Sequence, residues 1–305
     1  MQPQDTNNNS RKDSLTRSAT YASLSVALIL VSAKVWAWYS TSSVAVLSSL
    51  VDSALDVIAS AITFFAVWYA LSPADSEHRF GHGKSEGLAA FFQSLVIAGS
   101  ALFVCYEAIQ RFLDPRPLQD IGTGVFVMIG SIALTFVLLA YQRYVVKKTG
   151  SVAISADALH YKTDLLVNLS VAIALPLSVY TGLTVIDPIV GVCIAGYIMW
   201  STWEIAAKSL QILLDEEINI EDRKRIQKIA EQHSAVLGFH DMRTRSAGST
   251  LFIQFHLELA PDTSLFNTHT IMDEVEDAIR EQYPRCEIII HADPLGFPEK
   301  RDHFD

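Results

Sequence analysis

Six long apolar stretches constrain the fold of this 305-residue chain more than any other feature. A helix needs roughly 20 mostly apolar residues to cross the hydrocarbon core of a bilayer, which is about 30 Å thick. Segments in lipid must satisfy their own backbone hydrogen bonds, so we expect helices. Composition agrees, because 50% of the residues are hydrophobic and only 18% are charged. We predict six transmembrane helices, at residues 18–39, 43–71, 87–111, 121–143, 152–181 and 184–205.

Lysine and arginine are distributed unevenly between the two sides of the predicted membrane. One side carries Arg11, Lys12, Arg17, Arg79, Lys84, Arg143, Lys147, Lys148 and Lys208, and the other carries Arg111 and Arg116. Cytoplasmic loops are enriched in these residues, so both termini are expected in the cytoplasm. The polar segment 1–17 precedes no short apolar core with a small-residue cleavage site, so we expect no signal peptide and a retained first helix.

The chain after the last predicted span has a different pattern. A polar amphipathic helix over 218–234 is followed by two strands that Ala247-Gly248 separates as a hairpin, then by a helix over 264–282 and a strand over 286–294. The order αββαβ predicts a small α+β domain of the ferredoxin-like type. Its acidic balance argues against a nucleic-acid partner. The predicted parts are a polar cytoplasmic extension, a six-helix transmembrane domain, a cytoplasmic ferredoxin-like domain and a tail, at 1–17, 18–208, 209–294 and 295–305.

Carboxylates lie inside the second predicted helix, where charged side chains are costly and rare. Asp52 and Asp56 are four residues apart in VDSALD, so they share one helix face. The fifth predicted helix repeats this spacing with His160 and Asp164 in LHYKTD. A helix-end pair in headgroup water and a hydrogen-bonded core histidine are the structural alternatives. We favour a cation site, because three carboxylates and one imidazole form a donor set that zinc accepts.

Metal binding at such a site competes with proton binding. A divalent ion needs its ligands deprotonated, so the metal and the protons compete for the same side chains. Competition of this kind inside a membrane is the physical basis of metal/proton antiport. We therefore predict a secondary-active transporter of divalent metal ions.

Other ionisable residues in or near the predicted spans are given structural roles. Asp157 lies three residues before His160, nearer the cytoplasmic end of its helix, and we expect it to be solvated or to cap the helix rather than to bind metal. Lysine side chains can extend toward the polar membrane surface, and acidic residues near helix ends can reach water. This interpretation covers Lys34, Glu107, Lys162, Asp187 and Glu204.

Two more groups of metal-ligand residue types lie outside the predicted spans. The loop PADSEHRFGHGKSE places Asp75, His78 and His82 within eight residues, which suits a local divalent site, although a solvated polar loop is the alternative. In the tail domain, histidines fall on predicted strands and at a helix start, and strand alternation places His256 on the face opposite a set of apolar residues. Scattered surface histidines are the alternative there; the residues concerned are His240, His256, His269, His291 and Asp293.

Taken together, the motifs resemble those of the cation diffusion facilitators, and among them the bacterial zinc transporters of the YiiP/FieF type. The resemblance covers about residues 20–294. It rests on VDSALD, LHYKTD, the PADxxHxFGHGKxE loop and the stretches HDMRTRSAG, FIQFHLEL and IIIHADP. A single DxxxD would be weak evidence, but this ordered set across six spans and a tail domain is specific.

The resemblance implies a homodimer of six-helix protomers that exports Zn²⁺ across the inner (plasma) membrane by alternating access, with further Zn²⁺ bound in the cytoplasmic domain. It implies a transport site at Asp52, Asp56, His160 and Asp164, and a loop site at Asp75, His78 and His82. It also implies a binuclear site at the cytoplasmic dimer interface, at His240, His256, His269, His291 and Asp293. A charge interlock between the two domains is implied at Lys84 and Asp215.

The imidazole in the transport site favours zinc over manganese, which prefers all-oxygen ligands, and leaves Cd²⁺ and Fe²⁺ as further substrates. Two rival functions remain. One is a membrane metal sensor or scaffold of the same family that binds metal without transporting it. The other is a zinc enzyme, which we disfavour because no HExxH or other hydrolase motif occurs. The widely spaced Cys105, Cys193 and Cys286 indicate neither disulfides nor a thiolate metal site.

Overall fold

The computed structural model describes residues 3–41, 44–113, 125–181 and 186–296. Within these ranges the backbone is described throughout, but some helical side chains are not. They are the side chains of 3–9, 41, 44–49, Asp52, Arg111, 125–129, 171–181 and 186–187. The contacts divide the chain into a helical unit, Thr6–Gln211, and a second unit formed mainly by the residues from Ile212 onward.

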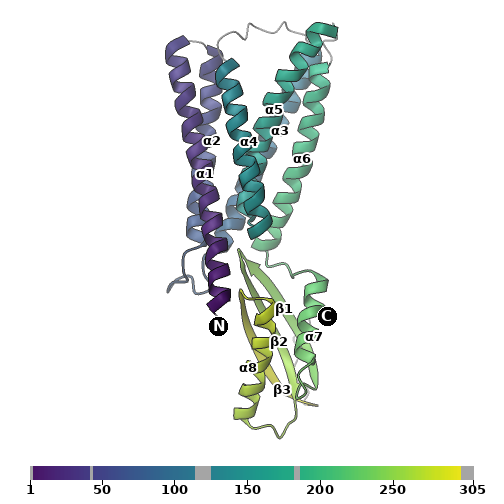
Figure 1. Ribbon diagram of the computed structural model, residues 1–305. Coiled ribbons are helices and arrows are strands. Elements are labelled where there is room, and N and C mark those ends of the chain that lie inside the picture. The colour runs from purple at the N-terminus through teal and green to yellow at the C-terminus, as the bar shows by residue number, and fades with distance from the viewer. Residues whose placement is uncertain (1–2, 42–43, 114–124, 182–185, 297–305) are drawn as a thin grey trace. The chain divides into compact units, whose positions relative to one another are not determined.

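Six long helices build the helical unit (Figure 1). They are α1 (Pro3–Thr41), α2 (Val44–Ala70), α3 (Lys84–Leu113), α4 (Val125–Thr149), α5 (Val152–Thr181) and α6 (Ile186–Leu213). Each of the six predicted spans corresponds to a helix among the described residues, and residues 43, 121–124 and 184–185 of these spans lie outside the description. Helix α1 begins at Pro3, so the polar segment expected before the first span is largely helical.

Four of these helices, α1, α2, α3 and α6, are long and apolar enough to cross a membrane within their described residues. In α4 and α5 the side chains of 125–129 and 171–181 lie outside the described residues. The described part of α4 carries Arg143, Lys147 and Lys148, and that of α5 carries Asp157, Lys162 and Asp164. The described part of α5 holds the predicted transport ligands His160 and Asp164.

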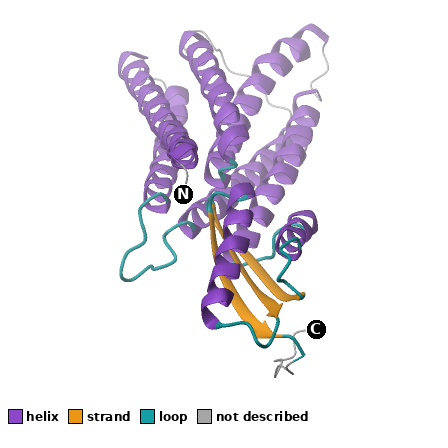
Figure 2. Ribbon diagram, turned by 60° about the horizontal axis from the view of Figure 1, so that its bottom comes forward, coloured by secondary structure: helices purple, strands orange, loops and turns teal. Residues whose placement is uncertain are grey.

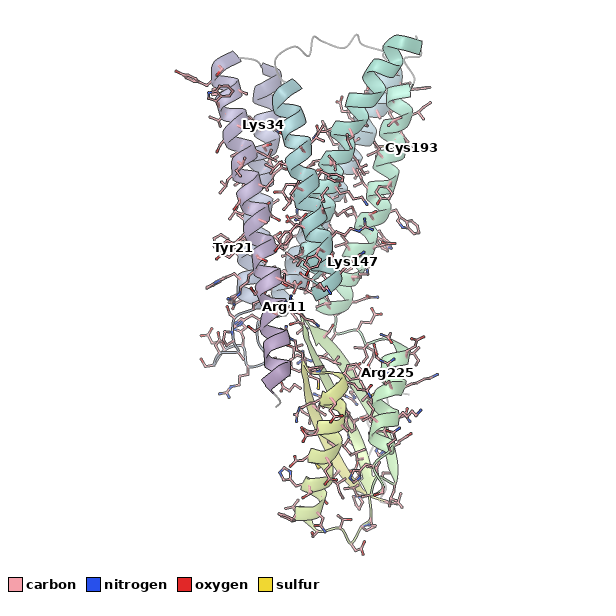
Figure 3. All side chains as sticks on the ribbon, in the orientation of Figure 1. Arg11, Tyr21, Lys34, Lys147, Cys193 and Arg225 are labelled. Carbon is pink, nitrogen blue, oxygen red and sulfur yellow. The ribbon has the colours of Figure 1, made fainter. Side chains whose placement is uncertain are left out.

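Large apolar side chains lie exposed on the helical unit, among them Trp36, Phe65, Phe103 and Trp200. Exposed apolar surface of this extent is rare on soluble monomers and suits contact with lipid. Figure 3 places Arg11 and Lys147 toward one end of this unit and Lys34 and Cys193 toward the other. Two of the basic residues predicted to be cytoplasmic therefore share one end of the bundle.

Helix α5 contacts α2, α3 and α4. Its first turns are fully buried at Ala153 and Ile154, which pack with Ala19, Val67 and Val145 of three other helices. Small side chains at these contacts let helix backbones approach closely, as is typical of membrane helix interfaces. This packing buries Asp157 and His160 of α5 in the interior of the unit.

The second unit has the predicted αββαβ order (Figure 2). Its elements are α7 (Ile220–Glu231), β1 (Gly238–Ala247), β2 (Thr250–Leu259), α8 (Leu265–Gln282) and β3 (Cys286–Pro294). The strand order is β1-β2-β3, with an antiparallel β1–β2 pair and a parallel β2–β3 pair. Gly248 makes the hairpin turn with φ +60°, a conformation that glycine adopts without steric cost.

One face of this sheet forms the hydrophobic core. Ile253, Phe255 and Leu257 of β2 are almost fully buried against both helices, which contribute residues such as Ile226 and Ile279. The predicted alternation along β2 is therefore confirmed. The opposite face carries most of the polar side chains of the sheet, together with Phe252 and Ile289, and His240, His256, His291 and Asp293 lie on it.

Candidate metal centres

Helices α2 and α5 bring three ligand side chains together inside the helical unit. His160 Nε2 lies 3.0 Å from Asp56 Oδ1 and 3.8 Å from Asp164 Oδ2. The His160 side chain is only 9% exposed. Asp164 follows His160 by one helical turn, so the two share a face of α5, while Asp56 approaches from α2. The side chain of Asp52 lies outside the described residues.

The spacing of this cluster suits one metal ion. The three donor atoms lie within 4.8 Å of one another. A tetrahedral ion with bonds of 2.0–2.2 Å holds its ligand atoms roughly 3.3–3.6 Å apart, and the two separations at His160 bracket that range. Three protein ligands would leave one of the four positions around a tetrahedral ion open.

Asp157 is buried rather than solvated, which corrects our expectation from the sequence. It has no exposed surface, and Gln142 Nε2 of α4 donates a hydrogen bond of 2.8 Å to its Oδ2. The expectation was wrong because sequence position placed Asp157 near a helix end, whereas α4 packs over this part of α5. The sequence signal for this arrangement was Gln142, an amide near the end of an apolar span.

The other ionisable groups in the helices make local contacts. Lys34 Nζ donates to Ser53 Oγ at 2.6 Å, and Trp200 Nε1 donates to Glu204 Oε1 at 3.1 Å. Lys162 donates to the hydroxyl of Tyr197 and lies over its ring. Glu107 is exposed on α3. These contacts agree with structural roles; the side chain of Asp187 lies outside the described residues.

The loop between α2 and α3 holds a second cluster. Asp75 lies 3.4 Å from His78 Nδ1 and 3.2 Å from His82 Nε2, and the two imidazole centroids are 4.8 Å apart. The backbone N–H of His78 donates to Asp75 Oδ1, which holds the pKa of this carboxylate below its usual range. An ionised carboxylate between two imidazoles is a suitable ligand set for a divalent ion.

His82 is the buried residue of this loop cluster whose ring nitrogens lack hydrogen bonds. Its side chain is 2% exposed, and neither ring nitrogen makes a hydrogen bond with the described residues, because the approach of Nε2 to Asp75 lacks hydrogen-bond geometry. A buried imidazole with two unpartnered nitrogens is costly in an apolar setting. The ring of Tyr69 covers it at 4.1 Å between centroids. A metal ion bound at this cluster would satisfy the free lone pair of the imidazole.

The third cluster is a row of histidines across the sheet. His240 on β1, His256 on β2 and His291 on β3 occupy paired positions in the two strand ladders. Neighbouring imidazole centroids in this row are 5.1 and 4.7 Å apart. Strand pairing therefore determines the site, because residues in register on one face lie side by side.

Asp293 joins these histidines at the end of β3. Its Oδ2 lies 2.8 Å from His256 Nδ1 and 3.7 Å from His240 Nε2, and its Oδ1 lies 3.1 Å from His291 Nε2. One carboxylate thus contacts all three imidazoles. His240, His256 and Asp293 place their donor atoms within 4.8 Å of one another.

Two acidic residues support the sheet cluster without being predicted ligands. Glu258 Oε1 lies 3.3 Å from His240 Nδ1, and Gly238 leaves room for it, because a Cβ there would lie 2.7 Å from Glu258 Oε2. Asp241 has φ 45° at the β1 bulge and places its carboxylate 3.9 Å from His256 Nε2. Strand alternation places Glu258 on the same face of β2 as His256. No sequence pattern indicated the bulge in β1.

His269 stands apart from the sheet cluster. It lies on α8 with its side chain 74% exposed, and its ion-pair partner is Asp273, at 3.6 Å on the same helix. Within its own unit Asp215 lies 3.6 Å from Arg245. Lys84 is the first residue of α3. The interlock between Lys84 and Asp215 stays a prediction from the resemblance.

A bundle of long apolar helices with a buried histidine–carboxylate cluster, joined to an αββαβ domain, defines a multi-span membrane protein of the transporter class. The chain matches the cation efflux transmembrane domain over residues 20–214 and the cation efflux protein cytoplasmic domain over residues 218–295. It therefore belongs to the cation efflux family, which is the cation diffusion facilitator family predicted from the motifs. This is a family of transporters rather than of enzymes.

Similar proteins extend over nearly the whole chain. Protein p34 of Rickettsia rickettsii is 42% identical over 295 residues, covering 97% of this chain and 96% of that protein. The cation-efflux pump FieF of Yersinia enterocolitica is 42% identical over 289 residues, covering 95% and 96%. A solved structure, the metal-bound C-terminal domain of the CzcD transporter from Thermotoga maritima, is 23% identical with a TM-score of 0.26, covering 26% of this chain and 94% of that one.

Proposed function

We propose that this protein is a secondary-active exporter of divalent metal ions, with Zn²⁺ as its main substrate, that exchanges the metal for protons by alternating access. The observation that carries the proposal is the cluster of Asp56, His160 and Asp164 on two helices of the membrane domain. The similarity of the whole chain to a cation-efflux pump named FieF supports export rather than storage. Asp52 completes the ligand set in this proposal.

The chemistry of exchange follows from the donors. Zn²⁺ binds the neutral imidazole of His160 through Nε2 and the ionised carboxylates of Asp56 and Asp164, so binding expels any proton that these groups hold. Movement of α2 and α5 then opens the site to the opposite side. Protons arriving there occupy the same atoms, weaken their hold on the metal and release it.

The substrate range follows from the one nitrogen ligand. Imidazole suits Zn²⁺ and the neighbouring transition metals, whereas Mn²⁺ is better matched by oxygen ligands alone. We therefore include Cd²⁺ and Fe²⁺ as further substrates. Replacing His160 by a carboxylate tests this assignment directly.

The loop and sheet clusters are assigned to bound rather than transported metal. We propose that Asp75, His78 and His82 hold one Zn²⁺, and that His240, His256, His291 and Asp293 hold the cytoplasmic Zn²⁺ ions. His269 faces solvent within one chain, so in a homodimer it is available to complete the site of a second copy. The Lys84–Asp215 interlock belongs to the same proposal.

We also propose an orientation in the inner membrane with both termini in the cytoplasm. The excess of lysine and arginine in the connections expected on that side supports this orientation, and Arg11 and Lys147 share one end of the helical unit (Figure 3). Labelling of single introduced cysteines from either side of intact cells measures the orientation.

Transport is tested in proteoliposomes that contain a zinc-sensitive dye. The wild-type protein should move Zn²⁺ and change the luminal pH in step with the metal, whereas Asp56→Asn should move neither metal nor protons. Glu107→Gln is the matched control, because Glu107 is an acidic side chain of a membrane helix outside the cluster. Zinc binding by wild type without any flux would instead favour the sensor or scaffold function.

A further inference from the structure

Asp157 belongs to a buried polar cluster between α1, α4 and α5 that is separate from the three metal clusters. Asp157 and Gln142 have no exposed surface, and Ser23 is 1% exposed. The side-chain amide of Gln142 donates to Ser23 Oγ and to Asp157 Oδ2, each at 2.8 Å. In the described part of the chain, Asp157 makes no hydrogen bond or ion pair with the predicted metal ligands. One amide therefore ties Asp157 to two other helices.

Two oxygen atoms of this cluster are left without partners. Asp157 Oδ1 and Gln142 Oε1 are buried and accept no hydrogen bond from the described residues. No lysine or arginine of the described chain pairs with Asp157. A buried carboxylate without a cation is strongly disfavoured in its ionised form. A proton on this carboxyl group would remove the charge and add a hydrogen-bond donor to the cluster.

Gln142 is suited to a neighbour that changes its protonation state. A side-chain amide carries a donor nitrogen and an acceptor oxygen of nearly the same shape, which exchange places by a half turn. The nitrogen donates to an ionised carboxylate, and the oxygen accepts from a carboxylic acid. The same side chain therefore stabilises both forms of Asp157 without any movement of the backbone.

The ionisable groups near Asp157 come from two helices. His160 and Tyr161 lie on α5 itself, and Asp56 lies on α2. The Tyr161 hydroxyl is hydrogen-bonded to Ser60 Oγ at 2.8 Å and to the carbonyl of Ser23 at 3.2 Å. From α1 and α4 the partners are the neutral Ser23 and Gln142. The hydrogen-bond partners of Asp157 are therefore neutral, and the ligand cluster whose charge changes in the proposed exchange lies one helical turn away.

We propose that Asp157 is a proton-binding site distinct from the metal ligands, and that it carries one of the protons exchanged for each metal ion. Burial against Gln142 favours the neutral acid. A movement of α5 away from α4 brings the carboxyl into contact with water, where it ionises, and the return movement requires a proton. The proposal rests on the proposed function and adds to it a site that links the position of α5 to proton transfer.

Infrared difference spectroscopy of the purified full-length protein tests the proton site without requiring transport. The wild-type protein should show the C=O stretching band of a buried carboxylic acid at neutral pH, and Asp157→Asn should lose that band. Asp262→Asn, in an exposed turn, should keep it. The introduced amide retains the shape of the original side chain and can still hydrogen-bond to Gln142, and thermal unfolding of each variant checks the fold. An unchanged spectrum in Asp157→Asn would overturn the proposal.

Gln142→Leu provides a second variant for the same measurement. Leucine removes the amide that donates to the ionised carboxylate, so the carboxylic-acid band should persist to higher pH than in wild type. If the band disappears at the same pH as in wild type, Gln142 does not stabilise the ionised form of Asp157. That result would contradict the proposal, in which Gln142 hydrogen-bonds to both forms of Asp157.

Proteoliposomes test the link to transport. With a zinc dye and a pH dye together, Asp157→Asn should still move metal but with one proton fewer for each ion. An unchanged proton-to-metal ratio would overturn the proposal and leave the proposed function standing. If wild type moves no metal while the infrared band is present in wild type and absent from Asp157→Asn, the proposed function fails and the proton site stands.

Discussion

The membrane cluster and the sheet cluster use the same kinds of ligand on different scaffolds. Asp56, His160 and Asp164 come from two helices, and contacts between side chains hold those helices together. His240, His256 and Asp293 come from three strands that backbone hydrogen bonds join in fixed register. Packed helices can slide or tilt at modest cost, whereas a strand shifted by one residue turns its side chains to the other face of the sheet.

In the proposed function, this difference suits the membrane cluster to metal exchange and the sheet cluster to metal retention. A transported ion must be bound and then released, so its ligands should lie on elements that move relative to one another. A resident ion benefits from ligands whose spacing is constant. The sheet cluster also has a carboxylate, Asp293, that contacts three imidazoles, and a supporting carboxylate at Glu258. Variants at each cluster test whether the two differ in this way.

The largest effect is expected from Asp56→Ala. It removes the α2 ligand described at His160, so Zn²⁺ flux into dye-loaded vesicles should fall to the level of protein-free vesicles. The sheet cluster should keep its metal, as measured by zinc content after gel filtration. Undiminished flux would show that the membrane cluster is not the transport site.

A thiol measurement tests how tightly the sheet is packed where β3 begins. Burial raises the pKa of Cys286 to about 11, and an ordinary thiol has a value of 9.0. Because the thiolate is the reactive form, alkylation at pH 8 should be about 100-fold slower than for an unperturbed thiol. In a Cys105→Ser, Cys193→Ser background, the rate should rise about tenfold per pH unit toward pH 11 and become ordinary on unfolding. Rapid labelling of the folded protein would indicate a looser strand.

Glu258→Gln should weaken metal binding by the sheet cluster about 10- to 100-fold, the range for groups that orient a ligand imidazole. Competition with a zinc chelator measures the affinity. Asp277→Asn, an exposed position on α8, is the matched control and should bind as wild type does. An affinity equal to wild type in Glu258→Gln would mean that Glu258 does not orient His240.

The smallest effect is expected from His160→Asp, which changes preference rather than abolishing transport. An all-oxygen site should raise Mn²⁺ flux relative to Zn²⁺ flux by several-fold, about 1 kcal/mol in relative affinity. Parallel flux assays with both ions give the ratio. If the ratio stays at its wild-type value, the imidazole is not the ligand that selects the metal.

Spacing within single elements made much of the molecule predictable. The four-residue intervals at Asp52/Asp56 and His160/Asp164 identify shared helix faces, and alternation along β2 identifies the buried side of the sheet at Phe255. Contacts between different helices and strands were harder to predict from the sequence. The burial of Asp157 depends on Gln142 of another helix, and the position of Asp241 depends on a bulge that no local pattern indicates.

Sequence alone determined the apolar spans, the αββαβ order and the residue types available for binding, because these follow from periodicity along one chain segment. Tertiary structure decided which of those residues meet. It brought α2 to α5 at His160, aligned three histidines across the sheet, left His269 in solvent and enclosed Asp157. Distances between segments remote in sequence depend on how whole surfaces pack, and no local spacing encodes that packing.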